Sequence, residues 1–225
     1  MVDFTLIVGN KAYSSWSLRA WLPLAHVGVP FEEVVLPFDG PAGVPTRAVR
    51  ERSPSGKVPL LQHGDLLVWD SLAIGEYLAE VFPEAGLWPA GRGARAAARS
   101  ISAEMHSGFA ALRTAMPMNV RREPFELATG PEVKGEVARI LSIWGECRRA
   151  HGGGGPFLFG AYTVADAMFA PIASRFRTYG VALDAGARAY VDAIHAHAPM
   201  QRWIAAARQE PWTIDAYERA GKSQG

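Results

Sequence analysis

The first part of the chain alternates short runs of β-forming residues with runs that have helical spacing. The segments 4–8 (FTLIV) and 31–36 (FEEVVL) are rich in apolar and β-branched residues, which predicts a strand in each. Apolar positions recur every three or four residues between them, which predicts a helix over about 15–28. A Gly/Pro-rich loop with a short helix is expected over about 39–52.

A hairpin and a third helix complete this part of the chain. The apolar runs at 58–62 and 66–69 flank the turn His63-Gly64-Asp65, as in a β-hairpin. A helix is predicted over about 71–81, and Pro83 stops it. Its apolar face is spaced at i, i+3, i+4 and i+7: Ile74, Tyr77, Leu78 and Val81. The predicted order of elements is βαβαββα.

The pattern changes after this unit. A Gly/Pro-rich stretch, FPEAGLWPAGRG, is typical of a linker, and beyond it almost all of the spacing is helical without a strand pattern. We therefore expect an α/β domain over 1–85, a linker over 86–94 and an all-helical domain over 95–225.

The helical part carries several start signals. The spacing predicts a long helix over 94–115 and another over about 131–150. Thr163 and Asp166 form a T-x-x-D pair, which is a capping pattern for a following helix. Pro199 is expected to open a last helix.

Two prolines fall inside predicted helices. Pro23 lies in the first helix, and Pro171 lies in the helix that follows the T-x-x-D pair. Each removes one backbone hydrogen bond, at a cost of about 3 kcal/mol if the helix stays straight. We predict a kink at each proline.

Composition and charge exclude several classes of function. Of the 225 residues, 49% are hydrophobic and 20% are charged, which is typical of a soluble globular protein and not of a disordered one. The formal net charge is +1, so no global field would recruit nucleic acid or an anionic membrane. No signal sequence and no run of about 18 apolar residues is present, so we expect a cytoplasmic protein without membrane contact.

The number of cysteines excludes further kinds of site. Cys147 is the single cysteine, which excludes an internal disulfide, a CxxC redox pair and a thiolate zinc site. We expect no metal centre. Any thiol chemistry must use sulfur that comes from another molecule.

One candidate binding segment is SPSGKVPLL at 53–61. Here Pro59 starts a predicted strand and leaves the main-chain N–H and C=O of Val58 available. An extended, peptide-like ligand can pair with such groups as an added strand. The alternative is that Pro59 only begins the strand.

A second candidate is the pair Asp70-Ser71 at the start of the third helix. A ligand α-carboxylate can accept hydrogen bonds from the hydroxyl and the helix N–H groups, while its α-ammonium faces Asp70. Helix capping would explain the same pair equally well.

The third candidate is Ser14-Ser15 at the start of the first helix. A serine hydroxyl and the positive end of a helix can stabilise a bound anion such as a thiolate. A serine hydrolase is the competing use of such a residue, but the chain has no G-x-S-x-G motif.

Together these features are more specific than any one of them. A βαβαββα unit with S-S at the first helix, K-V-P at the third strand and D-S at the third helix, followed by helices with T-x-x-D, resembles the glutathione transferase superfamily over essentially the whole chain. The stretch S-S-W-S-L-R at 14–19 is similar to the S-S-C-S-W-R of zeta-class enzymes. The resemblance implies a thioredoxin-like domain followed by a helical domain, and a homodimer.

The resemblance also implies roles for the serines. Ser14 would assist the glutathione thiolate as a hydrogen-bond donor, with Ser15 as its catalytic neighbour. We expect Ser15 to cap the helix while Ser14 points at the sulfur. Trp16 stands where the zeta-class enzymes have cysteine, so thiol exchange by the protein's own sulfur is not expected, and it is counted among the glutathione contacts.

The same resemblance assigns the glutathione site. Pro59 should be cis, and Val58 should pair with the cysteinyl backbone of glutathione. Asp70 and Ser71 should hold its γ-glutamyl end, with Lys57 as a further contact.

An electrophile site is expected between the two domains. Apolar and polar side chains mix there as in a pocket for an apolar electrophile with a polar or anionic end. The candidates are Met105, His106, Phe109, Arg113 and Asn119. Zeta-class isomerases also carry an arginine after the proline of the helix that follows T-x-x-D, for which Arg175 and Arg177 are candidates here.

The alternative to an electrophile site is a purely structural role for this segment, in which Met105 and Phe109 pack in the core and Arg121 and Arg122 form a solvated face. The predicted function is glutathione addition to, or glutathione-dependent isomerisation of, a small electrophile. The alternative function is a non-catalytic relative that binds glutathione or a protein partner.

Overall fold

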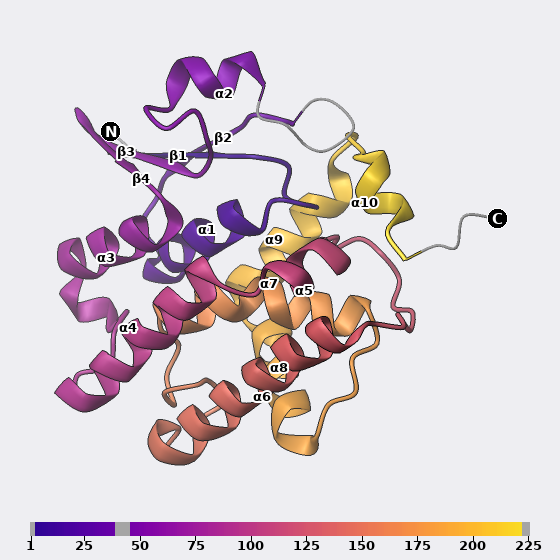
Figure 1. The fold of residues 1–225 in the computed structure, drawn as a ribbon. Helices are drawn as coiled ribbons and strands as arrows, with labels where there is room; N and C mark the ends of the chain where they lie inside the picture. Colours follow the sequence, from indigo (N-terminus) through magenta and orange to yellow (C-terminus); the bar gives the residue numbers. More distant parts are fainter. Residues whose placement is uncertain (1–2, 39–45, 222–225) are drawn as a thin grey trace.

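The computed structural model describes residues 3–38 and 46–221 of the chain (Figure 1). Its first part is a four-stranded mixed sheet in the order β2-β1-β3-β4. The strands are β1 (Phe4–Val8), β2 (Glu32–Val35), β3 (Leu60–His63) and β4 (Leu66–Trp69). β1 runs parallel to β2 and antiparallel to β3, and β3 and β4 form a hairpin. Three helices alternate with these strands: α1 (Ser15–Val27), α2 (Arg47–Arg52) and α3 (Ser71–Val81).

The predicted order βαβαββα is therefore confirmed. The helix predicted over about 71–81 has the observed bounds of α3, and a short 3₁₀ turn, η1 (Pro83–Ala85), follows it. His63 belongs to β3, so the hairpin turn is shorter than predicted and consists of Gly64 and Asp65. The predicted loop at 39–45 lies outside the described residues, as does the end of the chain after 221.

The second part is helical in every element that the structure describes. Its helices are α4 (Arg92–Ser107), α5 (Ala110–Ala115), α6 (Pro131–His151), α7 (Val164–Thr178), α8 (Ala185–Ala196), α9 (Ala198–Gln209) and α10 (Asp215–Arg219). The spacing did not single out α8 or the short α10. Among the described residues, no helix combines the length and apolarity needed to cross a membrane.

The expectation of one helix over 94–115 is wrong. The chain leaves the helical conformation between α4 and α5, where Phe109 has a left-handed φ of 62°. The phenyl ring of Phe109 is only 7% exposed and packs in the main core. Burial of this ring favours the turn over a continuous helix, and local spacing cannot show that.

Helix α7 is the central element of the helical part. Each of its residues except Arg177 is buried, and it packs against α1, α4 and α8. The predicted capping pair is present, since the Asp166 carboxylate accepts hydrogen bonds from the N–H (2.8 Å) and the hydroxyl (3.1 Å) of Thr163. α1 and α7 each continue past their internal prolines, Pro23 and Pro171.

Helix α1 connects the two parts. It lies between the sheet and the helices of the second part in Figure 1, and it packs against both α3 and α7. Its first turn therefore faces the junction at which the candidate site residues meet.

Candidate active site

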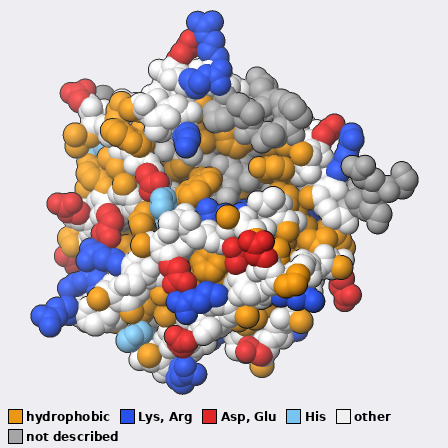
Figure 2. Space-filling model, viewed as in Figure 1, with side chains coloured by type: hydrophobic (Ala, Val, Ile, Leu, Met, Phe, Trp, Pro, Cys, Tyr) orange, Lys and Arg blue, Asp and Glu red, His pale blue; other side chains and the backbone are white. Residues whose placement is uncertain are grey.

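Two adjoining cavities lie where the start of α1 meets the helical part. The first has a volume of about 470 Å³ and the second of about 300 Å³. Both are lined by Trp16, Lys57 and Val58, so they form one composite site. Figure 2 shows hydrophobic side chains around a hollow near the centre of this face, with positively charged side chains close by.

The first cavity contains an exposed stretch of main chain. The Val58–Pro59 peptide bond is cis, as expected, and Leu60 then starts β3. Within the described part of the chain, neither the N–H nor the C=O of Val58 has a hydrogen-bond partner. A peptide-like ligand can therefore pair with Val58 without displacing an existing bond.

The opposite wall of the first cavity is the start of α3. Asp70 caps this helix, with its Oδ1 accepting the N–H of Leu72 at 2.8 Å, and it has a left-handed φ of 75°. Ser71 is 1% exposed, and its hydroxyl has no hydrogen-bond partner among the described residues. A buried hydroxyl without a partner costs about 1–3 kcal/mol, so a ligand oxygen would satisfy it.

His106 of α4 completes the first cavity. Its Nε2 lies 3.1 Å from Oδ2 of Asp70. Burial lowers the pKa of His106, and Asp70 only partly offsets this effect. The imidazole is therefore mainly neutral at pH 7, and Asp70 keeps its negative charge available for a ligand ammonium group.

The two serines at the start of α1 have different environments. Ser14 is the N-cap: its Oγ accepts the N–H of Ser17 at 3.3 Å and donates to Ser17 Oγ at 2.8 Å. Ser15 is the first helical residue, and its Oγ is 3.5 Å from Nη2 of Arg175. The expectation that Ser15 is the cap is therefore wrong, because Ser15 is already the first residue of the helix.

The second cavity has aromatic walls and a cationic end. Its aromatic side chains are Tyr13, Trp16, Phe38 and Tyr217. Lys57, Arg113 and Arg175 supply its positive charge. Arg175 is 5% exposed, and its Nη1 has no partner among the described residues, whereas its Nε donates to the carbonyl of Met116 at 2.7 Å.

No carboxylate of the described residues forms an ion pair with Arg175. Burial lowers the pKa of its guanidinium to about 10, with a further contribution from Arg113, so it remains protonated at pH 7. A buried charge without a counter-ion is costly. An anionic ligand group in the second cavity would supply that counter-ion.

Trp16 is held between guanidinium groups. Arg19 and Arg113 lie 4.7 Å and 5.1 Å from the centre of its ring, and the ring of His106 meets it edge-on at 5.0 Å. Arg19 is 1% exposed, and burial lowers the pKa of its guanidinium well below the ordinary value. These contacts fix Trp16 as the wall that both cavities share.

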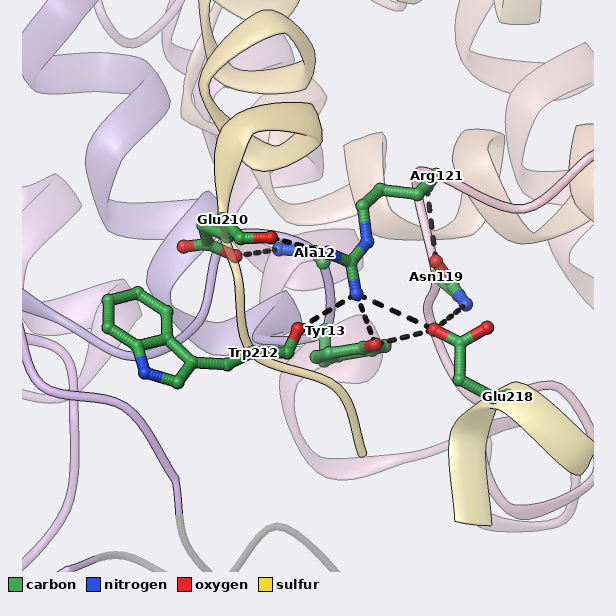
Figure 3. Close-up of polar contacts among 7 residues, drawn as sticks. All are labelled: Ala12, Tyr13, Asn119, Arg121, Glu210, Trp212 and Glu218. Carbon is green, nitrogen blue, oxygen red and sulfur yellow. Dashed lines mark hydrogen bonds and ion pairs between the residues drawn. The ribbon is translucent and has the colours of Figure 1, made fainter. Parts of the chain in front are cut away.

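The end of the chain closes the second cavity (Figure 3). The Glu210 carboxylate accepts the N–H groups of Lys11 and Ala12 at 2.7 and 3.0 Å. Arg121 donates to the carbonyls of Glu210 and Trp212, both at 2.9 Å. The segment after α9 is thereby tied to the loop that precedes α1.

Glu218 fixes α10 in the same network. It accepts hydrogen bonds from the Tyr13 hydroxyl at 2.5 Å and from Asn119 Nδ2 at 3.0 Å. Burial and this hydrogen bond raise the pKa of Tyr13. The phenol of Tyr13 is thus protonated and hydrogen-bonded to Glu218, while the neighbouring Tyr217 lines the second cavity.

The structure brings together some of the predicted residues and separates others. All six expected glutathione contacts line the first cavity: Trp16, Lys57, Val58, Pro59, Asp70 and Ser71. Arg113 and Arg175 line the second cavity, but His106 lines the first.

Met105, Phe109 and Asn119 line neither cavity. They are 0%, 7% and 2% exposed, because Met105 and Phe109 pack in the core and Asn119 is bonded to Glu218. Arg177 is exposed on the side of α7 away from both cavities.

Several lining residues were not identified from the sequence. In the first cavity these are Ser55 and Trp69. In the second they are Tyr13, Phe38, Pro117, Met118 and Tyr217. Tyr13 directly precedes the serines, and this adjacency is the one local signal that could have suggested it.

Comparison with protein families gives two matches. A model described as "Glutathione S-transferase, N-terminal domain" matches residues 13–81. A model described as "Glutathione S-transferase, C-terminal domain" matches residues 95–206.

Two curated relatives match shorter segments. Dichloromethane dehalogenase from Methylorubrum extorquens is 37% identical over 63 residues, which are 28% of this chain and 22% of that protein. Glutathione S-transferase 1 from Dianthus caryophyllus is 40% identical over 75 residues, or 33% of each chain. The match thus spans a third or less of either relative, and neither supports the resemblance to the zeta class.

Solved structures match over nearly the whole chain. A glutathione transferase homologue from Burkholderia, determined with bound glutathione, has a TM-score of 0.69 and 26% identity, and the match covers 92% of this chain and 100% of that one. The β-etherase LigF from Sphingobium has a TM-score of 0.66 at 20% identity, covering 91% and 100%. The second likeness shows the fold alone.

Proposed function

The chain belongs to the glutathione S-transferase family, and we propose that it is an enzyme that transfers glutathione to a small electrophile. The observation that carries this proposal is the first cavity, which brings all six expected glutathione contacts together. The bound glutathione of the Burkholderia homologue supports the same co-substrate.

The first cavity would hold glutathione by its two polar ends. The main chain of Val58 pairs with the cysteinyl residue, as an added strand would. The unpartnered hydroxyl of Ser71 donates to the γ-glutamyl α-carboxylate, and Asp70 faces the α-ammonium group. This orientation points the thiol toward Trp16 and the second cavity.

Ser14 would activate the thiol. As the N-cap it uses an acceptor lone pair, so its O–H proton can turn from Ser17 to a bound sulfur. A hydrogen bond to a charged group contributes about 1.5–3 kcal/mol, and a helix N-terminus about 0.3–1 kcal/mol. Together they would lower the thiol pKa from about 8.5 by roughly 1.3 to 3, which leaves about 40% or more of the sulfur as thiolate at pH 7.

The electrophile would bind in the second cavity. Its aromatic walls suit an apolar body, and the unpaired Nη1 of Arg175 suits an anionic end. The thiolate attacks the electrophilic atom, a carbon–sulfur bond forms, and a leaving group departs with the electron pair of its bond. Isomerisation through a reversible addition of the thiolate is the second reaction that this site can support.

The test compares Ser14→Ala with Ser15→Ala. We expect Ser14→Ala to raise the pKa of enzyme-bound glutathione by about 1 to 2 with little change in affinity, because one charge-assisted hydrogen bond is lost. Ser15→Ala is the matched control and should leave that pKa close to the wild-type value. The measurement is the thiolate absorbance of bound glutathione as a function of pH; equal titrations in wild type and Ser14→Ala would contradict the role of Ser14.

A turnover assay distinguishes an enzyme from a protein that only binds glutathione. Wild-type protein that binds to a glutathione column should also convert chlorodinitrobenzene, by substitution of its chloride, or maleylacetone, by isomerisation. Binding without turnover of either would favour the non-catalytic alternative. A cytoplasmic homodimer is part of the same proposal.

A further inference from the structure

A third cavity lies on the opposite side of α7 from the active site. It has a volume of about 100 Å³ and lies between α7, α8, α9 and the segment 120–124. None of its lining residues lines either of the other two cavities. A ligand in this cavity would therefore share no lining residue with glutathione or with the electrophile.

Ser174 points to a ligand in this cavity. It lines the cavity and is 3% exposed, yet its hydroxyl has no hydrogen-bond partner among the described residues. A serine within a helix usually donates to the carbonyl four residues earlier, which would be that of Ala170. Because this bond is absent, a buried donor is left for an acceptor that the described part of the chain does not provide.

The charges around the cavity favour a negative occupant. Arg177 and Arg208 line it, and neither forms an ion pair with a carboxylate of the described residues. Arg121 and Arg122 also line it, but their guanidinium groups donate to main-chain carbonyls elsewhere. Glu123 is the one carboxylate in the lining that the structure describes, so positive charge is in excess.

His195 adds a second neutral donor. Its side chain lies in the lining, and burial, with a smaller effect of the Arg177 charge, lowers its pKa to about 4; the backbone of Ala173 and the Asp192 carboxylate only partly offset this shift. At pH 7 the imidazole is neutral and can donate through one nitrogen. An anion beside the ring would favour its protonated form, and so would raise this pKa.

We propose that this third cavity binds a phosphate group, either inorganic phosphate or the phosphate of a small organic ester. Water occupies about 30 Å³ per molecule, so the cavity has room for roughly three waters or one tetrahedral oxyanion. The oxyanion accepts from the Ser174 hydroxyl and the His195 imidazole. The guanidinium groups of Arg177 and Arg208 neutralise its charge at the exposed side.

The experiment follows the imidazole C–H signals of His195 by NMR in the full-length protein without glutathione. Inorganic phosphate or glycerol phosphate is added at pH 7 and constant ionic strength, with chloride as the balancing anion. We expect a saturable shift and a higher pKa for His195. Saturation by both compounds identifies a site for the free anion, and saturation by the ester alone identifies a site for an organic phosphate.

Matched variants test whether the shift of the His195 signals reports binding in the third cavity. Arg177→Gln and Ser174→Ala should each weaken binding about tenfold, the effect of losing one hydrogen bond to a charged group. Arg177 is exposed, so its replacement tests the site even if Ser174→Ala does not fold. Arg188→Gln on the exposed face of α8 should bind as the wild type does. A shift linear in concentration for both compounds, or equal affinity in Arg177→Gln, would overturn the proposal.

Discussion

At the scale of single residues, Arg175 sets the charge of the second cavity. Its Nε and Nη2 are held by the carbonyl of Met116 and the hydroxyl of Ser15, while Nη1 is left without a partner. A guanidinium that is fixed in this way is pre-organised, so little side-chain entropy is lost when an anion binds. Substrate selection by charge is therefore expected to depend on this residue.

Replacing Arg175 with methionine tests that selection. We expect kcat/KM for an electrophile with a carboxylate to fall about 10- to 100-fold, because a hydrogen bond to a charged group is lost. For neutral chlorodinitrobenzene we expect little change, and this substrate serves as the internal control. Steady-state kinetics with both substrates provide the measurement, and an equal loss for both would show that Arg175 only supports the fold.

At the scale of elements, the start of α7 anchors the helix that carries Arg175. Asp166 is fully buried and accepts hydrogen bonds from Thr163, from the N–H of Leu158 at 3.1 Å and from the hydroxyl of Tyr190 at 3.2 Å. It thus joins α7 to the preceding loop and to α8. By contrast, Asp184 caps α8 through the single N–H of Ala187 at 2.7 Å, at an exposed position.

The two caps should therefore differ in their effect on stability. We expect Asp166→Ala to lower the free energy of unfolding by about 2–6 kcal/mol, since two buried N–H groups lose their acceptor. Asp184→Ala should lower it by about 1 kcal/mol, the usual cost of an exposed cap. Urea denaturation of both variants measures the difference; similar losses would mean that burial does not add to the cap.

At the scale of the whole molecule, a histidine cluster joins the two domains. The rings of His26 of α1, His197 between α8 and α9, and Tyr162 form a triangle: each histidine ring centre is 4.4 Å from that of the tyrosine, and the two histidine ring centres are 5.2 Å apart. Burial is the main cause that lowers the pKa of both histidines, that of His197 to about 4. The cluster is therefore stable when its imidazoles are neutral.

This arrangement predicts a loss of stability in acid. Between about pH 6.5 and pH 4 the unfolded chain binds more protons than the folded one, so the free energy of unfolding should fall as the pH falls. The stabilisation of the folded state by the neutral histidines is fully present above pH 6.5. For His197 we expect this stabilisation to be about 2 kcal/mol after solvent screening. His197→Phe retains an aromatic ring without the titration and should reduce this slope in urea denaturation at pH 7, 6 and 5. Part of the slope should persist, because burial also lowers the pKa of His195 to about 4 and lowers the pKa of His26 and His106. An unchanged slope would contradict the assignment.

The edge of the sheet supports the predicted homodimer. Leu66, Leu67 and Trp69 of the edge strand β4 are 57%, 41% and 46% exposed. An apolar edge of this kind is usually covered by another chain. A second copy of this chain is the expected partner.

We therefore expect Leu66→Glu to shift the protein from dimer to monomer in sedimentation velocity. Trp212→Ser removes an exposed side chain (39%) at the other end of the chain and should leave the dimer intact. A wild-type protein that sediments as a monomer would contradict the prediction.

Local chemistry made much of the fold predictable. The bounds of α3, the capping pair before α7 and the order of strands and helices all depend on residues within a few positions of one another. The break at Phe109 escaped prediction because it depends on where the phenyl ring goes after the helices have packed, and periodicity carries no information about that. The cap at Ser14 is local, since its Oγ bonds to Ser17, but two adjacent serines offered two possible caps.

The candidate site likewise has one part that local sequence predicts and one part that it does not. The sequence by itself determined one wall of the first cavity, because the residues of that wall come from two short motifs, K-V-P and D-S, which hairpin β3–β4 and helix α3 bring together. His106 of α4 reaches the same cavity only through the packing of the helical part. Only the tertiary structure decided the second cavity. Ser15 and Arg175 are 160 positions apart, and Tyr217 reaches the cavity through contacts of Glu218 with Tyr13 and Asn119, 205 and 99 positions away. Contacts of this range depend on how whole helices pack against one another, whereas the pattern along the chain specifies only which face of each helix is buried.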